Sequence, residues 1–298
     1  MSEVTGADFE RRFTEDRLAV NNRLAAMLPP ESEAPVSLHG AMRYATIGGG
    51  KRLRGILCIA SHRLYGDPYP AAALDAGCAI ECLHAYTLIH DDLPALDNDD
   101  FRRGKPACHK RYGEAVAILA GDALQALAFE SIARCAIPPE NAVAAIRILA
   151  RTAGSLHLVG GQVADMEGEG QEPTADQVHF IHCRKTAELI AASLSIGAAI
   201  AGAAREARAE IHEIGRAAGL AFQIVDDILD VEGSAERVGK ALRKDRGKRK
   251  ITYPAHFGIE RSHETARRLI DDATHRIQKL GDEGYIRHLL ERIVERSS

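Results

Sequence analysis

Two clusters of aspartates are the residues of this chain best suited to chemistry. They read DDLPALD at residues 91–97 and DDILD at residues 226–230. Each cluster follows an apolar run of helical character, where an uncompensated carboxylate is very costly. A divalent cation can compensate the charge, and Mg²⁺ prefers carboxylate oxygens together with substrate phosphates. The two clusters therefore predict a cage that holds one diphosphate group through shared Mg²⁺ ions.

The second cluster places its carboxylates on one face of a helix. Asp226 and Asp230 are four residues apart, which stacks them one above the other, with Asp227 beside them. Like charges at this spacing repel each other, and a bridging cation removes the repulsion. The alternative is a solvated acidic face. We favour a metal site because the neighbouring residues are apolar: Ile224, Val225, Ile228 and Leu229.

The first cluster lies at the predicted end of a helix. Pro94 cannot continue a helix without losing a backbone hydrogen bond. The residues after Asp92 therefore form a bulge, which lets Asp97 return toward Asp91 despite the wider spacing. We expect the largely acidic residues 98–100 that follow to face the solvent.

Two basic motifs accompany the aspartates. Arg102 and Arg103 follow the first cluster, and adjacent arginines can grip two separate anions through bidentate contacts. Salt bridges to the nearby aspartates are the alternative. Earlier in the chain, GGGKRLR at residues 48–54 combines flexible glycines with the N-terminus of a following helix, which suits an anion. Lys51 and Arg54 share one face there. These cations could hold a second diphosphate without metal.

The composition excludes several classes of protein. Hydrophobic residues make up 46% of the 298 residues and charged residues 27%, which allows a sizeable core. The formal net charge of −4 and the lack of a long basic tract beside aromatics give no support to nucleic-acid binding. Residues 1–17 lack the apolar segment of a signal peptide. No stretch of about 18 residues is apolar without interruption, so we expect no transmembrane helix and no integral membrane association.

The cysteines indicate a reduced protein. Six are present, with no CxxC pair and no small disulfide-rich scaffold around them, so we expect free thiols and a cytoplasmic location. Cys78 and Cys82 share a helix face and could bind a metal. We interpret them instead as small buried residues.

The chain is predicted to be all-α and to form a single domain over residues 1–298, with an N-terminal helix and loop up to about residue 35. Alanine and leucine are abundant, whereas runs rich in Val, Thr and Tyr are scarce. A long apolar helix, residues 71–92, leads into the first aspartate cluster, and another, residues 206–231, carries the second. Further helices are expected over residues 113–136, 141–160 and 174–202, and a loop over residues 233–250.

Taken in this order, the motifs resemble those of the short-chain trans-polyprenyl diphosphate synthases, most closely the bacterial-type farnesyl diphosphate synthases. The similarity extends over nearly the whole chain. It rests on GGKRLR at residues 49–54, on the first aspartate cluster with RRGKP at residues 102–106, and on FQIVDDILD at residues 222–230. The resemblance implies a large helical bundle of the isoprenoid synthase type with a central active-site cavity.

Two departures from the family pattern are visible. Gly55 stands where proline is common, and we expect little consequence from it. Arg243 stands where the family usually has glycine, in a late loop that closes over the substrate in the family, so the closing of that loop is in question.

The resemblance also implies roles for individual residues. Isopentenyl diphosphate would be bound by Lys51, Arg54, His84 and Arg103, and Mg²⁺ by Asp91, Asp97 and Asp226. The allylic diphosphate would be bound by Arg102, Lys185, Thr186, Gln223 and Lys240. Of these, Lys185, Thr186 and Gln223 would be catalytic, because their oxygens could stabilise an allylic cation. Gln162 and Asp165 would line the cavity. Outside this context, His84 would be interpreted as an ordinary helix histidine.

The expected reaction is the head-to-tail condensation of isopentenyl diphosphate with dimethylallyl and geranyl diphosphate. It starts with Mg²⁺-assisted ionisation of the allylic diphosphate. By the logic of the family, Tyr86 and Thr87, five and four residues before Asp91, set the product length. A tyrosine ring pointing down the cavity would stop growth at farnesyl diphosphate (C15), although the ring could also pack in the core. Because Cys82 and Ala85 are small, a geranylgeranyl (C20) synthase is the alternative.

Two other functions are less consistent with the motifs. A terpene cyclase would need only one diphosphate site, which leaves the Lys51, Arg54 and His84 set unexplained. A non-catalytic partner of another synthase would typically lose one aspartate motif, and both are intact here. We expect a homodimer, because the family is usually homodimeric and the long apolar helices leave surface for the contact.

Overall fold

The computed structural model describes residues 4–168, 174–238 and 252–294. Helices form nearly all of the regular structure in these ranges, so the all-α prediction is confirmed. Lys240 and Arg243 lie outside the described residues. The described residues group into two compact units. The N-terminal unit comprises residues 5–149 and 196–203, and the C-terminal unit comprises residues 4, 150–168, 174–195, 204–238 and 252–294. The single domain stays a prediction.

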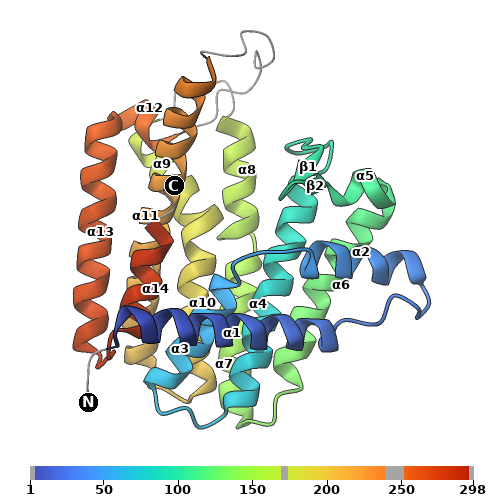
Figure 1. The fold of residues 1–298 in the computed structure, drawn as a ribbon, viewed down its shortest axis with the longest axis horizontal. Coiled ribbons are helices and arrows are strands. Elements are labelled where there is room, and N and C mark those ends of the chain that lie inside the picture. Colours follow the sequence, from blue (N-terminus) through green and yellow to red (C-terminus); the bar gives the residue numbers. More distant parts are fainter. Residues whose placement is uncertain (1–3, 169–173, 239–251, 295–298) are drawn as a thin grey trace. The chain divides into compact units, whose positions relative to one another are not determined.

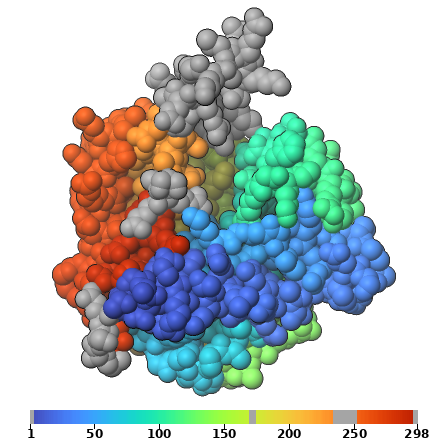
Figure 2. Space-filling view, in the orientation of Figure 1, coloured from blue at the N-terminus to red at the C-terminus, as the bar shows by residue number. Residues whose placement is uncertain are grey.

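The N-terminal unit is built around one long helix, α4. Its elements are α1 Gly6–Met27, α2 Val36–Ile47, α3 Leu53–Leu64, α4 Pro70–Asp91, β1 Phe101–Arg102, β2 Lys105–Pro106, α5 Cys108–Tyr112, α6 Glu114–Ala133 and most of α7 Pro139–Ala153. Helices α3 and α6 lie beside α4 (Figure 1). Helix α1 packs against α3 and α4 and forms part of the surface (dark blue in Figure 2).

Helices α3 and α4 cross at a pair of glycines. A Cβ atom added to Gly77 would lie 2.8 Å from the carbonyl oxygen of Gly55, and one added to Gly55 would lie 3.2 Å from that of Gly77. Only a residue without a side chain permits this approach. The crossing holds the beginning of α3, which carries Arg54, against the part of α4 that leads to Asp91.

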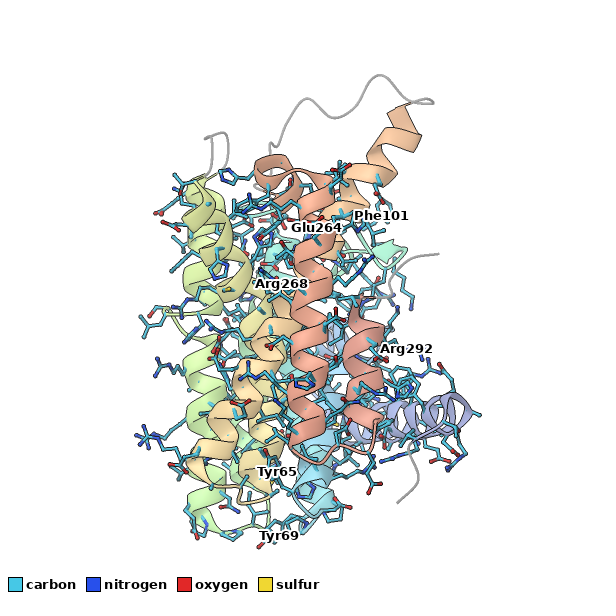
Figure 3. The ribbon with its side chains drawn as sticks, turned by 90° about the vertical axis from the view of Figure 1, so that its left-hand side faces the viewer. Tyr65, Tyr69, Phe101, Glu264, Arg268 and Arg292 are labelled. Carbon is cyan, nitrogen blue, oxygen red and sulfur yellow. The ribbon has the colours of Figure 1, made fainter. Side chains whose placement is uncertain are left out.

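The C-terminal unit surrounds another long helix, α11. Its elements are α8 Leu158–Gly168, α9 Ala175–Ile181, the π-helix η1 His182–Ala187, most of α10 Glu188–Ile200, α11 Arg205–Val238, α12 Tyr253–Phe257, α13 Ile259–Lys279 and α14 Tyr285–Val294. Helix α11 packs against η1, α12, α13 and α14. Helix α13 is amphipathic: Ala266 and Ile270 are buried, whereas Glu264 and Arg268 lie on its exposed face (Figure 3).

Three boundaries differ from the sequence-based expectation. The helix expected over residues 174–202 is interrupted by the π-helix, a form that is frequent at functional sites. The helix expected over residues 141–160 ends at Ala153, and α8 then runs through Gly160 and Gly161. Helix α11 continues to Val238, six residues into the loop that was expected to begin at Gly233. Hydrophobic periodicity does not show a π-turn or a short break between two apolar helices.

All six cysteines are free, as expected. Cys78 and Cys82 are buried in α4, and burial raises the pKa of the Cys82 thiol to about 12. A thiol in this state is poorly suited to bind a metal.

Three helical stretches are long and apolar enough to cross a membrane by length and composition alone. They are α4, α6 and residues 139–168. The sequence-based expectation required about 18 apolar residues without interruption and therefore missed these stretches, because a few polar residues break each of them. In α4, 72% of the apolar window is buried inside the protein, compared with 39% in α6. The apolar character of α4 is therefore explained by the core, whereas α6 keeps an exposed apolar face.

Candidate active site

The first aspartate cluster has the predicted bulge. Helix α4 ends at Asp91, and the backbone N–H of Asp97 donates to the carbonyl oxygen of Asp91 at 2.8 Å. This hydrogen bond brings the two aspartates back to the same place at the end of the helix. Both are partly buried, whereas residues 98–100 are exposed, as expected.

Asp92 has a different role from its neighbour. It is buried, and Nε of Arg102 donates to its Oδ1 at 2.9 Å, with Nη2 of the same guanidinium also bound to it. Burial raises the pKa of the Asp92 carboxyl, and the hydrogen bond from Arg102 opposes that shift. Arg102 also contacts Asp99 at 3.3 Å. The ion-pair alternative is therefore observed for Arg102, and its binding of a diphosphate stays a prediction.

A tight hairpin brings Arg103 to the glycine-rich loop. Strands β1 and β2 pair Arg102 with Lys105, and Arg103 in the turn has a φ of 54°. Its Nη1 donates to the carbonyl oxygen of Gly49 at 2.7 Å. A Cβ atom on Gly50 would lie 3.2 Å from this Nη1, so the glycine leaves room for the guanidinium. The two basic motifs, which are separate in the sequence, thus meet within the N-terminal unit.

The loop that carries Lys51, just before α3, is held by a buried ion pair that the sequence-based assignment missed. Arg52 and Glu81 are 4% exposed each, with Nη1 of Arg52 3.5 Å from Oε2 of Glu81. Arg52 also donates to the carbonyl oxygen of Thr46 at 2.7 Å and to Oδ1 of Asn21 at 2.8 Å. Since the Arg52 side chain is directed into the protein, it serves the loop rather than a ligand.

Glu81 also caps the beginning of α3. Its Oε1 accepts the backbone N–H of Gly55 at 3.0 Å, which is one of the donors that a helix N-terminus leaves without an internal partner. The expectation that Gly55 has little consequence stays a prediction, but the structure uses its N–H, which proline lacks, and its small size at the helix crossing. The sequence contains a sign of this buried role, because Glu81 is the only acidic residue between Asp75 and Asp91 in a largely apolar helix.

Arg54 and His84 form a contact at this position. Nη1 of Arg54 lies 3.3 Å from Nε2 of His84. Burial lowers the pKa of His84 well below its usual value of 6.5, and the nearby charges of Arg54 and Arg103 lower it further. His84 is therefore neutral near pH 7, with Nε2 accepting from Arg54 and Nδ1 carrying the proton. Lys51 is exposed beside the buried Arg52. Together these residues offer several donors to an anion.

The predicted residues of the C-terminal unit are also brought together. Nζ of Lys185 lies 2.6 Å from Oδ2 of Asp165, and Oγ1 of Thr186 donates to Oε1 of Gln223 at 2.8 Å. Both Lys185 and Thr186 belong to the π-helix. A Cβ atom on Gly161 would lie 2.5 Å from the backbone nitrogen of Lys185, which shows how closely α8 packs on this π-helix.

The second aspartate cluster divides its carboxylates between solvent and interior. Asp226 is partly buried and Asp230 is exposed, whereas Asp227 is buried. Asp227 accepts hydrogen bonds from Gln223, from the backbone N–H of Tyr253 and from the ring of His182. A metal is thus compatible with Asp226 and Asp230 but not with Asp227, whose oxygens are already used.

Within the described residues, no three His, Cys, Asp or Glu side chains lie close enough to hold a metal on protein ligands alone. This fits Mg²⁺, which usually binds through one or two carboxylates and completes its shell with substrate phosphates and water. Carboxylates such as those of Asp91 and Asp97 are the oxygen ligands that such an ion prefers, and their binding of Mg²⁺ stays a prediction.

The residues expected to limit product length lie on α4. Tyr86 is partly buried, and its ring lies 4.9 Å from the ring of His90 in an edge-to-face arrangement. Burial raises the pKa of the Tyr86 hydroxyl. Oγ1 of Thr87 donates to the carbonyl oxygen of His84 at 2.8 Å, so this hydroxyl is turned back onto its own helix. Tyr86 is the bulkier of the two, and the limit that these residues set on product length stays a prediction.

We predict that Glu81→Gln destabilises the protein by about 3 kcal/mol, because the substitution leaves the buried charge of Arg52 without its counter-ion. Chemical denaturation of the two proteins measures this difference. The matched control is Glu130→Gln, which breaks an exposed pair with Arg134 on α6 and should cost less than about 1 kcal/mol. Equal losses in both variants would contradict the role assigned to Glu81.

The lowered pKa of His84 predicts a pH dependence of stability. The unfolded chain binds a proton near the usual pKa of 6.5, whereas the folded chain does not, so the stability contributed above this pKa is lost as the pH falls below it. One such group changes the free energy of unfolding by at most about 1.4 kcal/mol per pH unit. Denaturation of the ligand-free protein between about pH 7.5 and 5.5 should show a smaller slope in His84→Gln than in the wild type. Identical slopes would contradict the assignment.

Comparison with known proteins places the chain in a family. The polyprenyl synthetase family profile matches residues 35–293. The chain is 45% identical over 287 residues to the heterodimeric geranylgeranyl pyrophosphate synthase large subunit 2 of Arabidopsis thaliana, covering 94% of this chain and 76% of the relative. It is 44% identical over 258 residues to the farnesyl diphosphate synthase of Geobacillus stearothermophilus, covering 86% of each.

Comparison with solved structures leads to the same family. The crystal structure of an FPP/GFPP synthase from Zymomonas mobilis matches with a TM-score of 0.86 and 35% identity, covering 97% of this chain and 100% of the other. The fold is therefore that of the isoprenoid synthases. The chain belongs to the polyprenyl synthetase family and is a short-chain trans-prenyl synthase that elongates prenyl diphosphates.

Proposed function

We propose that the protein condenses isopentenyl diphosphate with dimethylallyl and then geranyl diphosphate, and that farnesyl diphosphate is its main product. The observation that carries this proposal is the separation of charged groups in the N-terminal unit. Carboxylates gather at the end of α4, whereas Arg54, His84, Arg103 and Lys51 lie at or beside the glycine-rich loop. One diphosphate is suited to the first group through metal, and the other to the second group without it.

Asp91, Asp97 and Asp226 are the carboxylates that would hold Mg²⁺. When bound, Mg²⁺ would neutralise the negative charge that develops on the departing pyrophosphate. Arg102 and Lys185 would add positive charge to the same group. Their present partners, Asp92 and Asp165, keep these two cations in fixed positions. Preorganised charges of this kind stabilise a transition state without reorganising during the reaction.

The allylic cation would be stabilised by oxygens of the C-terminal unit. The side-chain oxygens of Thr186 and Gln223 lie 2.8 Å apart and present partial negative charge from η1 and α11. The carbonyl oxygen of Lys185 is a third acceptor on the same π-helix. The double bond of isopentenyl diphosphate attacks the cation, and a proton is then lost. The released pyrophosphate can take that proton, so the reaction requires no base from the protein.

Arg54, His84, Arg103 and Lys51 would bind isopentenyl diphosphate. Arginine guanidinium groups bind phosphate oxygens in a bidentate manner. A neutral His84 adds an Nδ1–H donor without adding to the repulsion among the cations around it. Binding an anion here would offset that repulsion.

The product length rests on Tyr86. Its ring stands about one and a half helical turns before Asp91, on the same side of α4 as the ring of His90. A ring of this size would stop the growing chain at C15. The relatives named above include both farnesyl and geranylgeranyl synthases, so a C20 product is the second candidate.

We also propose a cytoplasmic homodimer. Helix α6 exposes Ile118 and Leu119, by 43% and 58%, and only 39% of its apolar window is buried within the chain. A second copy of the chain would cover this face, and burial of apolar area is the main force in such contacts. The exposed apolar residues then need no membrane to explain them.

The proposal predicts the products of the enzyme and how Tyr86 limits them. Purified protein with Mg²⁺ and isopentenyl diphosphate should extend dimethylallyl and geranyl diphosphate to C15 and leave farnesyl diphosphate unextended. The Tyr86→Ala variant should release mainly C20 or longer products, because the smaller side chain removes the obstacle. Chromatography of the dephosphorylated products measures both.

The control is Tyr65→Ala, at the end of α3 remote from the aspartate cluster, which should keep the C15 product. A C20 product from the wild type would keep the class of enzyme but overturn the role of Tyr86. If no starter is condensed, the proposed function itself is wrong.

A further inference from the structure

A chain of hydrogen bonds connects to the two proposed catalytic oxygens, those of the Thr186 and Gln223 side chains. Asp227, on α11, occupies its centre. Its Oδ2 lies 2.7 Å from Nε2 of His182 and 2.7 Å from the backbone nitrogen of Tyr253, and its Oδ1 accepts from Nε2 of Gln223 at 3.0 Å. Nδ1 of His182 lies 2.6 Å from the carbonyl oxygen of Val178. All five residues belong to the C-terminal unit.

The members of this chain are buried. The His182 side chain is 3% exposed and that of Asp227 is 8% exposed. The ring of His182 stands between two acceptors, the Val178 carbonyl and the Asp227 carboxylate. Three donors then face the two oxygens of Asp227. A buried carboxylate surrounded in this way holds each of its partners in a defined orientation.

The orientation of the Gln223 amide follows from this arrangement. Asp227 as a carboxylate can only accept, so the NH₂ group of Gln223 must face it. The amide oxygen consequently faces Thr186, whose hydroxyl donates its single proton to it at 2.8 Å. With that proton used, the Thr186 oxygen can only accept from any further neighbour. Both groups thus present electron-rich oxygens, which suits a positive charge.

His182 is the group that keeps Asp227 in place. It stands at the first position of the π-helix, three residues before Lys185 and four before Thr186, and it links that helix to α11. Without the ring, the carboxylate would lose its buried side-chain hydrogen-bond partner and could rotate away from Gln223. The amide could then turn over and present its NH₂ group toward Thr186.

We propose that His182 is a positioning residue which, through Asp227, sets the polarity of the Gln223–Thr186 pair. This inference rests on the proposed function, because the polarity matters only where a cation develops next to these oxygens. It predicts that loss of His182 slows the chemical step and leaves the binding of both diphosphates nearly unchanged.

A double-mutant cycle between His182 and Gln223 tests the inference. The single-turnover rate with geranyl and isopentenyl diphosphate is measured by rapid quench in four proteins: the wild type, His182→Leu, Gln223→Leu and the double variant. His182→Leu should lower the rate by roughly tenfold or more in the wild type. In the Gln223→Leu background it should lower the rate by less than about twofold, because the oriented amide is already gone.

Two further variants separate positioning from stability. His182→Gln keeps an N–H donor for Asp227 and should recover a large part of the rate. His62→Leu removes a different buried histidine, which contacts Asp67 at 2.8 Å in the N-terminal unit. This control should lower the melting temperature but leave the single-turnover rate unchanged. Where Leu at position 182 prevents folding, the cycle is run with His182→Asn, whose shorter side chain cannot reach Asp227.

The experiment distinguishes failure of this inference from failure of the proposed function. An equal loss of rate from His182→Leu in both backgrounds, or a change of the KM values with an unchanged rate, would overturn the inference while the proposed function stands. A wild-type protein that condenses none of the starters would overturn the proposed function instead.

Discussion

The arrangement of the candidate active site depends on buried carboxylates that must be compensated. An uncompensated charge inside a helical core costs several kcal/mol, so each buried carboxylate accepts hydrogen bonds from several donors. Glu81 gathers the Arg52 guanidinium and the Gly55 N–H, and Asp227 gathers His182, Gln223 and the Tyr253 N–H. In each unit, the donors that compensate the buried carboxylate also fix the position of nearby residues. Those residues are suited to bind a diphosphate or to stabilise a cation.

This constraint separates two kinds of acidic residue that look alike in the sequence. Asp91, Asp97 and Asp226 are only partly buried and remain suited to a metal. Asp92 and Asp227, each directly beside one of them, are buried and engaged with Arg102 and His182. Successive side chains on a helix point in different directions. The second aspartate of each cluster can therefore be buried while the first stays accessible to a metal.

Much of the site could be predicted from the sequence, because its chemistry resides in short motifs. The bulge from Asp91 to Asp97 followed from Pro94, and the all-α fold followed from composition and periodicity. The supporting residues could not be predicted in the same way. Glu81 and Arg52 are 29 positions apart, and His182 and Asp227 are 45 apart, so only the fold brings each pair together. The π-helix at Lys185 was missed because hydrophobic periodicity does not distinguish one π-turn from the α-helical turns around it.

In the proposed enzyme, cations alone hold one diphosphate, and carboxylates with Mg²⁺ hold the other. Calorimetric titration with and without EDTA tests this division, with isopentenyl diphosphate and a non-ionising thiolo analogue of geranyl diphosphate as ligands. We predict that removal of Mg²⁺ changes the Kd of isopentenyl diphosphate by less than about threefold and weakens the analogue by roughly tenfold or more. If isopentenyl diphosphate required Mg²⁺ as strongly as the analogue, the proposed division between the two groups of residues would be wrong.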